Sequence, residues 1–216
     1  SNNVFNTKVF STLFILTIVL SFFIRFDNLG HSNFYGDETK VLYLDKTIPA
    51  TEFFFNQRKG PMQFAVTSLT EKLTASYSEL YLRVPYAIAG FLSVITFYFF
   101  VKQILKILYK NSFNSPINLS INYISLIATI LFSFSGFNVA FSRTIQYQTF
   151  LTFFGILGLY LFFKKRYLLS GIMYGLAFLS HYDAIFFTTP LLYLFLNNLL
   201  NYDIKNFFNE DLKIFK

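Results

Sequence analysis

The sequence predicts an all-α, polytopic membrane protein, and its composition and charge pattern support this fold class. Of the 216 residues, 54% are hydrophobic and 13% are charged, and the mean hydropathy is +0.48. A typical soluble domain carries about 25% charged residues. The charges also fall in short segments that are separated by long uncharged runs, as the apolar core of a bilayer requires.

Six uncharged runs are long enough to cross a bilayer. The shortest of them enclose 16 residues, as between Lys8 and Arg25, and the longest encloses 32, between Lys110 and Arg143. A span needs about 20 mostly apolar residues, and flanking Lys and Arg side chains can reach back to the interface and shorten that length. We therefore predict transmembrane helices over residues 8–25, 83–106, 119–139, 145–163, 167–182 and 184–201.

The first of these spans, 8–25, has the length of a secretory signal peptide as well. No small-residue cleavage site follows it, and five more spans do, so we interpret it as a retained helix. The chain has no cysteine, which excludes disulfides and thiol chemistry. The formal charge of +7 arises mostly at the ends of spans and does not indicate a nucleic-acid partner.

Segment 61–73 is apolar on one helical face and polar on the other. Its 13 residues would rise only about 20 Å as a helix, whereas the bilayer core is about 30 Å thick. We therefore predict that it lies in the membrane interface and does not cross. Its apolar residues are Met62, Ala65, Val66, Leu69 and Leu73.

An interfacial 61–73 segment fixes the predicted orientation. It gives the cytoplasmic side ten basic residues and three acids, and the other side eight of each, which satisfies the positive-inside rule. The N-terminus is then cytoplasmic, and residues 26–82 form one external loop. We expect one transmembrane module over 1–203, followed by a cytoplasmic tail or the start of a further region over 204–216.

Two adjacent acids, Asp37 and Glu38, follow a glycine early in the predicted external loop. In a structural interpretation, Asp37 caps a helix over the amphipathic stretch 38–47, and Glu38 favours the positive end of the helix dipole. In a functional interpretation, a carboxylate held at the membrane surface acts as a general base. The two are compatible, because a cap also fixes a carboxylate in space. Asp37 and Glu38 are therefore candidate catalytic residues.

Four cations on the same predicted face could bind an anion. Arg58 and Lys59 precede Pro61, which suits the first position of a helix, and helix N-termini favour anions. Arg83 and Arg143 lie at the outer ends of predicted spans, where the alternative is contact with lipid headgroups alone. We take Lys59, Arg58 and Arg143 as candidate phosphate-binding residues and Arg83 as a supporting residue.

Polar residues at two breaks between spans complete the candidate set. Tyr147 and Gln148 follow one break, and His181 lies two residues before Asp183 at another. We interpret Tyr147, Gln148 and His181 as supporting residues. The only other histidine is His31, so no metal-ligand spacing is present, and no metal or other cofactor is predicted.

In the predicted topology these residues lie on one side of the membrane, and a base together with phosphate-binding cations suits group transfer from a lipid phosphate. In the order in which these motifs occur along the chain, the sequence resembles the GT-C class of membrane glycosyltransferases, in the superfamily of protein O-mannosyltransferases and aminoarabinose–lipid A transferases. The motifs that carry the resemblance run along most of the chain. They are Gly36-Asp37-Glu38, Lys59-Gly60-Pro61, Arg83-Val84-Pro85, Ser142-Arg143 with Tyr147, and Gly175-Leu176-Ala177 with His181-Tyr182.

The resemblance implies an inverting glycosyltransferase that moves a sugar from a polyprenyl phosphate to a lipid, protein or glycan on the non-cytoplasmic side. It implies that Asp37 is the base, that Lys59 and Arg143 lie near the donor phosphate, and that segments 38–47 and 61–73 form two juxtamembrane helices. Members of the family continue with further spans and often with a soluble external domain. We therefore expect this chain to be an N-terminal portion.

Two other classes of function fit the same residues. A transporter or flippase of a lipid-linked substrate would use the cations without a base, and a non-catalytic membrane subunit would use them only for headgroup contact. A transporter more often carries ionisable groups within its spans, and the predicted spans carry them only at their ends. The predicted partners are a polyprenyl-phosphate sugar donor and membrane lipids, with no nucleic acid. The sugar, the acceptor and the oligomeric state stay open.

Overall fold

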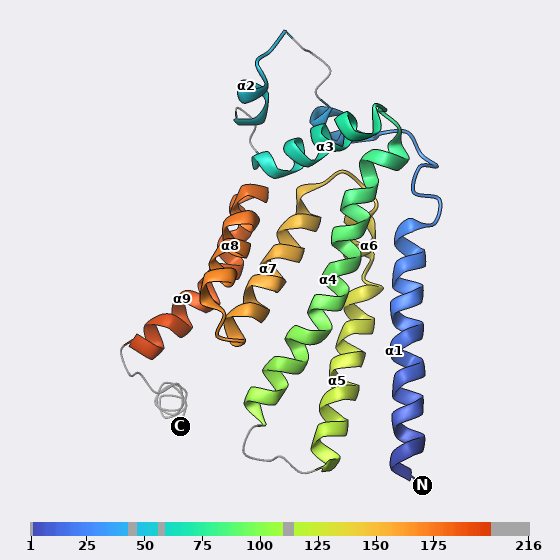
Figure 1. The fold of residues 1–216 in the computed structure, drawn as a ribbon, viewed down its shortest axis with the longest axis vertical. Helices are drawn as coiled ribbons and strands as arrows, with labels where there is room; N and C mark the ends of the chain where they lie inside the picture. The colour runs from blue at the N-terminus through green and yellow to red at the C-terminus, as the bar shows by residue number, and fades with distance from the viewer. Residues whose placement is uncertain (1, 43–46, 56–58, 110–114, 200–216) are drawn as a thin grey trace, which may run out of the picture.

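The computed structural model describes residues 2–42, 47–55, 59–109 and 115–199. All regular elements in these ranges are helices, and they contain no β-strand, which confirms the predicted all-α class. Long helices run side by side along the long axis of the molecule, and short ones cross one end of it (Figure 1).

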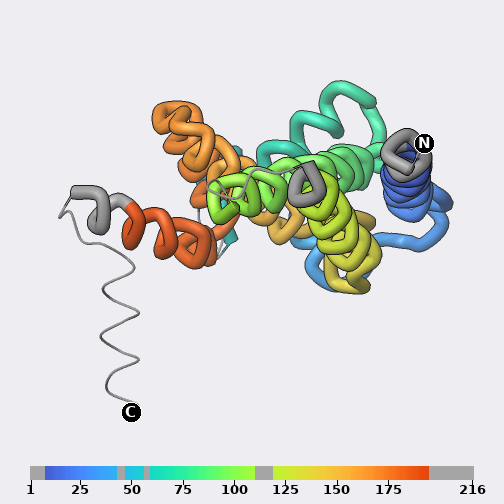
Figure 2. The backbone as a smooth tube through the Cα atoms, turned by 90° about the horizontal axis from the view of Figure 1, so that it is seen from below, coloured from blue at the N-terminus to red at the C-terminus, as the bar shows by residue number. Residues whose placement is uncertain are grey.

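Helix α4 (Glu79–Leu108) lies in the middle of the bundle, with α1 (Asn2–Phe26) and α5 (Ser115–Ser133) on one side (Figure 2). Helices α7 (Tyr147–Phe163) and α8 (Tyr167–Ser180) lie on the other side. Many of the large apolar side chains on the outer faces of these helices are exposed, which suits a lipid environment.

Two described helical segments, Lys8–Phe26 and Glu79–Leu108, are long and apolar enough to cross a membrane. A third candidate is the bent pair formed by α5 and α6 (Gly136–Ser142). Helices α7 and α8 are apolar but shorter, with 17 and 14 residues. The chain thus has the helices of a membrane protein.

The predicted span 119–139 is divided in the structure, because α5 ends at Ser133 and α6 leaves it at an angle of 59°. The buried guanidinium of Arg25 donates to the carbonyl oxygen of Ser133 (3.0 Å), and also to the carbonyl (3.0 Å) and hydroxyl (2.8 Å) of Ser21. A cation that binds a terminal carbonyl stabilises the negative end of a helix. Arg25 of α1 therefore stabilises the point at which α5 ends.

The end of the bundle is covered by a 3₁₀ helix, η1 (Gly36–Val41), and two α-helices, α2 (Ala50–Phe55) and α3 (Pro61–Thr74) (Figure 1). Helix α3 confirms the predicted helix at 61–73. The predicted helix at 38–47 is wrong in type and extent, since only the short η1 forms there and residues 43–46 lie outside the described residues. Helix α2 was not predicted.

Helix α3 turns its polar face to the protein. Gln63, Thr67 and Ser68 are buried, whereas Leu69 and Leu73 of the apolar face are 57% and 78% exposed. Thr67 shares a hydrogen bond of 2.9 Å with the hydroxyl of Tyr86 on α4. Leu69 and Leu73 are therefore free to contact lipid at the end of the bundle, whereas Met62 and Val66 of the same face pack against the core.

The larger core cluster lies directly beneath this covering layer. It joins η1 and α3 to α4, α7 and the turn before α7, so the layer is fixed to the bundle by apolar packing. Its buried members are Val41, Phe64, Leu82, Tyr86, Ala89, Ile145 and Phe150.

Candidate functional site

Glu38 is buried beneath the covering layer and connects it to the helices of the bundle by hydrogen bonds. Only 2% of the residue is exposed, and its carboxylate accepts two hydrogen bonds from Arg83, through Nε (2.9 Å) and Nη2 (2.8 Å). It also accepts the backbone N–H groups of Tyr35 (3.0 Å) and Ile145 (2.9 Å). One carboxylate thus ties together η1, α4 and the turn between α6 and α7.

Arg83 also binds backbone carbonyl groups of the loop after α1. Its guanidinium donates to the carbonyl oxygens of Leu29 (3.0 Å), Ser32 (2.9 Å) and Asn33 (3.1 Å). Arg83 is 2% exposed, so it does not reach the headgroup region as a free cation. Glu38 was predicted to be catalytic together with Asp37, and this prediction is wrong. Its carboxylate is buried and already accepts four hydrogen bonds, so it is not accessible to a substrate.

Asp37, next to Glu38, points the other way and is partly exposed, with 39% of its side chain accessible. Its Oδ1 lies 2.7 Å from Nζ of Lys40, and its Oδ2 lies 2.7 Å from Nζ of Lys59. These hydrogen bonds, that of Lys40 first, lower the pKa of Asp37 from 3.8 to about 2. Asp37 is not the helix cap, because Tyr35 is the N-cap residue and Glu38 binds back to it.

Lys59 is positioned by an unusually close contact between two helix ends. A Cβ atom on the next residue, Gly60, would lie 2.2 Å from the carbonyl oxygen of Leu179 and 2.6 Å from that of Ser180. Glycine is therefore required for the start of α3 to meet the end of α8. Arg58, the other predicted cation of this segment, lies outside the described residues.

Tyr147 and His181 continue the site beneath Lys59. The Lys59 ammonium lies 5.7 Å from the centroid of the Tyr147 ring, and that ring stacks on the imidazole of His181 with 4.0 Å between centroids. His181 is 5% exposed, and its Nδ1 lies 2.9 Å from Oδ2 of Asp183. Asp37, Lys59, Tyr147, His181 and Asp183 form a continuous series, which we term the Asp37 cluster.

Arg143 does not contact this cluster. Its guanidinium donates to the carbonyl oxygens of Ile24 (2.6 Å) and Asn28 (3.5 Å) near the end of α1. It lines a separate groove of about 360 Å³, together with Asp27 and Phe134. The structure therefore places the two predicted phosphate-binding residues that it describes, Lys59 and Arg143, in different surroundings.

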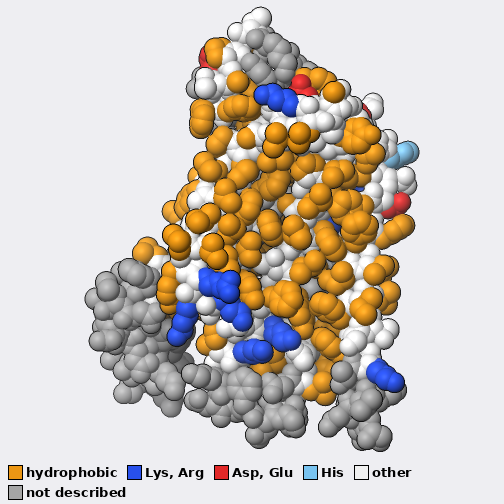
Figure 3. Space-filling view, in the orientation of Figure 1, with side chains coloured by type: hydrophobic (Ala, Val, Ile, Leu, Met, Phe, Trp, Pro, Cys, Tyr) orange, Lys and Arg blue, Asp and Glu red, His pale blue; other side chains and the backbone are white. Residues whose placement is uncertain are grey.

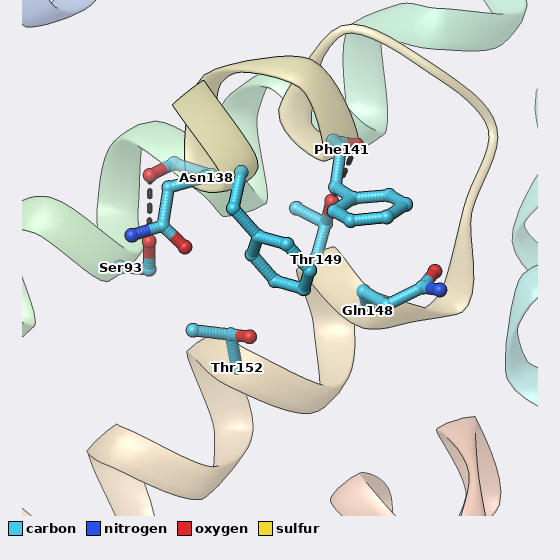
Figure 4. Close-up of a pocket in the computed structure, with 8 residues that line it drawn as sticks. Ser93, Asn138, Phe141, Gln148, Thr149 and Thr152 are labelled. Carbon is cyan, nitrogen blue, oxygen red and sulfur yellow. Dashed lines mark hydrogen bonds between the residues drawn. The ribbon is translucent and has the colours of Figure 1, made fainter. Parts of the chain in front are cut away.

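Gln148 also lies away from the cluster. It lines a small pocket of about 10 Å³ between α4, α6 and α7, with Ser93 and Thr152 among the other lining residues (Figure 4). Its Oε1 is buried and has no hydrogen-bond partner among the described residues. The pocket has room for about one water molecule, which could satisfy this oxygen.

Two residues of the site were missed from the sequence. Lys40 is one, although its spacing of three residues from Asp37 on a helix was a usable signal. Asp183 is the other: it was not chosen as a site residue, although its position two residues after His181 indicated a possible partner for that histidine, and the contact of 2.9 Å confirms the pairing. In the described ranges no group of three His, Cys, Asp or Glu side chains could hold a metal ion.

Comparison of the chain with protein-family models, with curated proteins and with solved structures finds no match. The resemblance to GT-C transferases therefore rests on the motifs of this chain alone. The Asp37 cluster combines a partly exposed carboxylate, a neighbouring ammonium group and a buried histidine paired with a second partly exposed carboxylate, at one end of an apolar bundle.

Proposed function

We propose that this chain is the membrane module of a glycosyltransferase of GT-C type, which moves a sugar from a polyprenyl phosphate to an acceptor. The observation that carries the proposal is the Asp37–Lys59 pair, a partly exposed carboxylate that contacts an ammonium group at 2.7 Å. The carboxylate can accept a proton, and the ammonium group can bind a phosphate. Both lie in the covering layer next to apolar helices, where a lipid-linked donor presents its phosphate.

The proposed topology has six membrane-crossing segments and a cytoplasmic N-terminus, with the covering layer outside. Two features support it. Lys and Arg side chains gather toward the end of the bundle opposite the covering layer (Figure 3), as the positive-inside rule requires. Leu69 and Leu73 of α3 are exposed, which suits a helix lying in the interface.

In the proposed reaction, a hydroxyl or amine of the acceptor attacks the anomeric carbon of the donor. A new bond forms between the acceptor atom and that carbon, while the bond from the carbon to the phosphate oxygen breaks. The acceptor's proton passes to a carboxylate oxygen of Asp37. The lipid phosphate leaves with the bonding electrons, and Lys59 stabilises its charge.

The substitution Asp37→Asn tests this assignment. It keeps the size of the side chain and removes the base, so turnover should fall by at least about 100-fold while donor binding and folding persist. The matched control is Asp27→Asn, because Asp27 is a carboxylate near the end of α1 that lines the separate Arg143 groove. The assay uses the full-length protein in liposomes with a polyprenyl-phosphate sugar and an acceptor. Equal turnover in Asp37→Asn and the parent protein would remove Asp37 from the mechanism.

A further inference from the structure

A groove of about 680 Å³ lies between the end of α7, helix α8 and helix α9 (Ile185–Leu199), away from the Asp37 cluster. Its volume lies within the range of about 300–1,000 Å³ that holds small ligands. Most of its lining is apolar or aromatic. The residues that line it include Phe162, Tyr167, Tyr174, Leu191 and Leu192.

One polar group in this groove lacks a partner. Tyr174 is 6% exposed, and its hydroxyl is buried without a hydrogen bond to any described residue. The neighbouring hydroxyl of Ser170, by contrast, donates to the carbonyl oxygen of Gly158 at 2.8 Å. A buried tyrosine hydroxyl usually finds a partner. The end of the Tyr174 ring lies against Gly158 of α7, where a Cβ atom would meet Cζ at 2.9 Å, so the hydroxyl lies within the packing between α7 and α8.

A basic turn borders the groove. The turn Lys164-Lys165-Arg166 lies between Phe162 and Tyr167, which both line the groove. The side chain of Gln103 donates to the carbonyl oxygen of Phe163 (3.4 Å), which brings the end of α4 and its lysines next to this turn. The cations gathered there are Lys102, Lys106, Lys164, Lys165 and Arg166.

This cluster of cations has no acidic neighbour in the described ranges. The described acids lie in the covering layer, near the end of α1, at the start of α4 and on the turn before α9, which are all toward the opposite end of the bundle (Figures 1 and 3). The positive charge of this basic region is therefore uncompensated by the described chain.

We propose that this groove binds one anionic phospholipid. Its phosphate contacts the Lys164–Arg166 turn, and an acyl chain lies along the apolar lining of the groove. Basic pockets between membrane helices are the usual sites for anionic headgroups. A soluble anion would leave the apolar lining exposed, and a neutral lipid would bring no negative charge to the Lys164–Arg166 turn. This site is independent of sugar transfer.

The chain contains no tryptophan, so a single reporter can test the site. Leu192→Trp places the reporter in the groove, and phospholipids brominated on the acyl chain quench it on contact. In phosphatidylcholine vesicles, brominated phosphatidylglycerol should quench this reporter at a lower mole fraction than brominated phosphatidylcholine does. The expected preference is about fivefold for each cation that contacts the headgroup.

Two controls separate a built site from general attraction to the surface. The reporter Ile124→Trp stands on α5, which does not line the groove, at a position that is 46% exposed, and it should show no such preference. Gly171→Leu fills the groove without a clash, because a Cβ there meets nothing within 4 Å, and it should abolish the preferential quenching. Gly175→Leu has the same open surroundings one turn along α8, outside the groove, and should leave the preference intact.

Replacing Lys164, Lys165 and Arg166 by Gln together should reduce the preference toward one. If that variant does not fold, Gly171→Leu decides the matter, because it keeps every charge. Equal preference at Ile124→Trp, or unchanged quenching in Gly171→Leu, would overturn the proposal. So would displacement of the brominated lipid by a polyprenyl phosphate at lower concentration than by phosphatidylglycerol, since the groove would then hold the donor's tail.

Discussion

Replacing Glu38 by Gln should destabilise this protein far more than the neighbouring change Asp37→Asn. Oε1 of Glu38 accepts Arg83 Nε and the N–H of Ile145, whereas Oε2 accepts Arg83 Nη2 and the N–H of Tyr35. A glutamine can keep only one of these oxygens, and the NH₂ group that replaces the other cannot accept. Whichever way the amide turns, one backbone donor and one guanidinium donor lose their acceptor.

The magnitude follows from burial. Each orphaned buried donor costs about 1–3 kcal/mol, and Arg83, 2% exposed, also loses its counter-charge. Breaking a buried ion pair by removing one partner costs about 3–5 kcal/mol in total, which we take as the expected loss for Glu38→Gln. The control Asp37→Asn removes an ion pair from a side chain that is 39% exposed, so it should cost about 1 kcal/mol or less.

Unfolding of each variant in mixed micelles, followed by circular dichroism, measures both changes. The substitution Arg83→Met and the double variant Glu38→Met/Arg83→Met complete a cycle. The double variant should lose less than the sum of its single changes, because neither charge is left alone. Some loss will persist in it, since Leu29, Ser32 and Asn33 lose the donor to their carbonyl oxygens. Equal midpoints for Glu38→Gln and Asp37→Asn would refute this account of the covering layer.

Three further predictions concern the contacts around the Asp37 cluster. Gly60→Ala should displace the start of α3 and lower turnover, because its Cβ would meet backbone atoms of α8 at 2.2–2.7 Å, whereas Gly175→Ala should be silent in the same activity and unfolding measurements. The pKa of Asp37 is lowered from 3.8 to about 2, so its ion pairs stabilise the fold above about pH 4 and are lost as the pH falls through about 2. Unfolding midpoints of the parent should therefore drop across that window more than those of Asp37→Asn. Lys59→Gln should weaken binding of a polyprenyl phosphate by roughly 10- to 150-fold, the loss of one charge-assisted hydrogen bond. Arg143→Gln, which removes contacts to α1, should leave donor affinity unchanged in the same titration, and a loss equal to that of Lys59→Gln would return Arg143 to the donor site.

Local patterns predicted those parts of the fold that local physics decides. The bounds of α3 followed from Pro61 at its first position and from an amphipathic repeat, and the predicted 61–73 differs from the structure by one residue. The apolar runs likewise predicted where α7 and α8 lie. The six-span topology and its orientation stay predictions, because length and apolar composition qualify only two of the described helices, or three with the bent pair.

The remaining differences arise from contacts between residues far apart in the chain. At the break between α5 and α6, the carbonyl oxygen of Ser133 accepts a hydrogen bond from Arg25, which lies 108 residues earlier. The burial of Glu38 depends on Arg83 and Ile145, which lie 45 and 107 residues after it. These separations of 45 to 108 residues are far longer than the stretch of about 10 to 20 residues over which a helical pattern is interpreted. Asp37 and Glu38 are therefore both candidate catalytic residues from the sequence, and their different partners in the structure separate them.

The pairing of Asp37 with Lys59 sets an order of events for the proposed reaction. A carboxylate with a pKa near 2 is ionised at neutral pH, but it is a weak acceptor for the proton of a hydroxyl. Lys59 contributes to that low pKa through both its hydrogen bond and its charge. A donor phosphate that draws the Lys59 ammonium toward itself would remove part of this effect and raise the basicity of Asp37, while Lys40 would keep the carboxylate in place. In this arrangement the base gains strength only after the donor has bound. The acceptor is therefore deprotonated only when a donor sugar is bound and ready to be transferred to it.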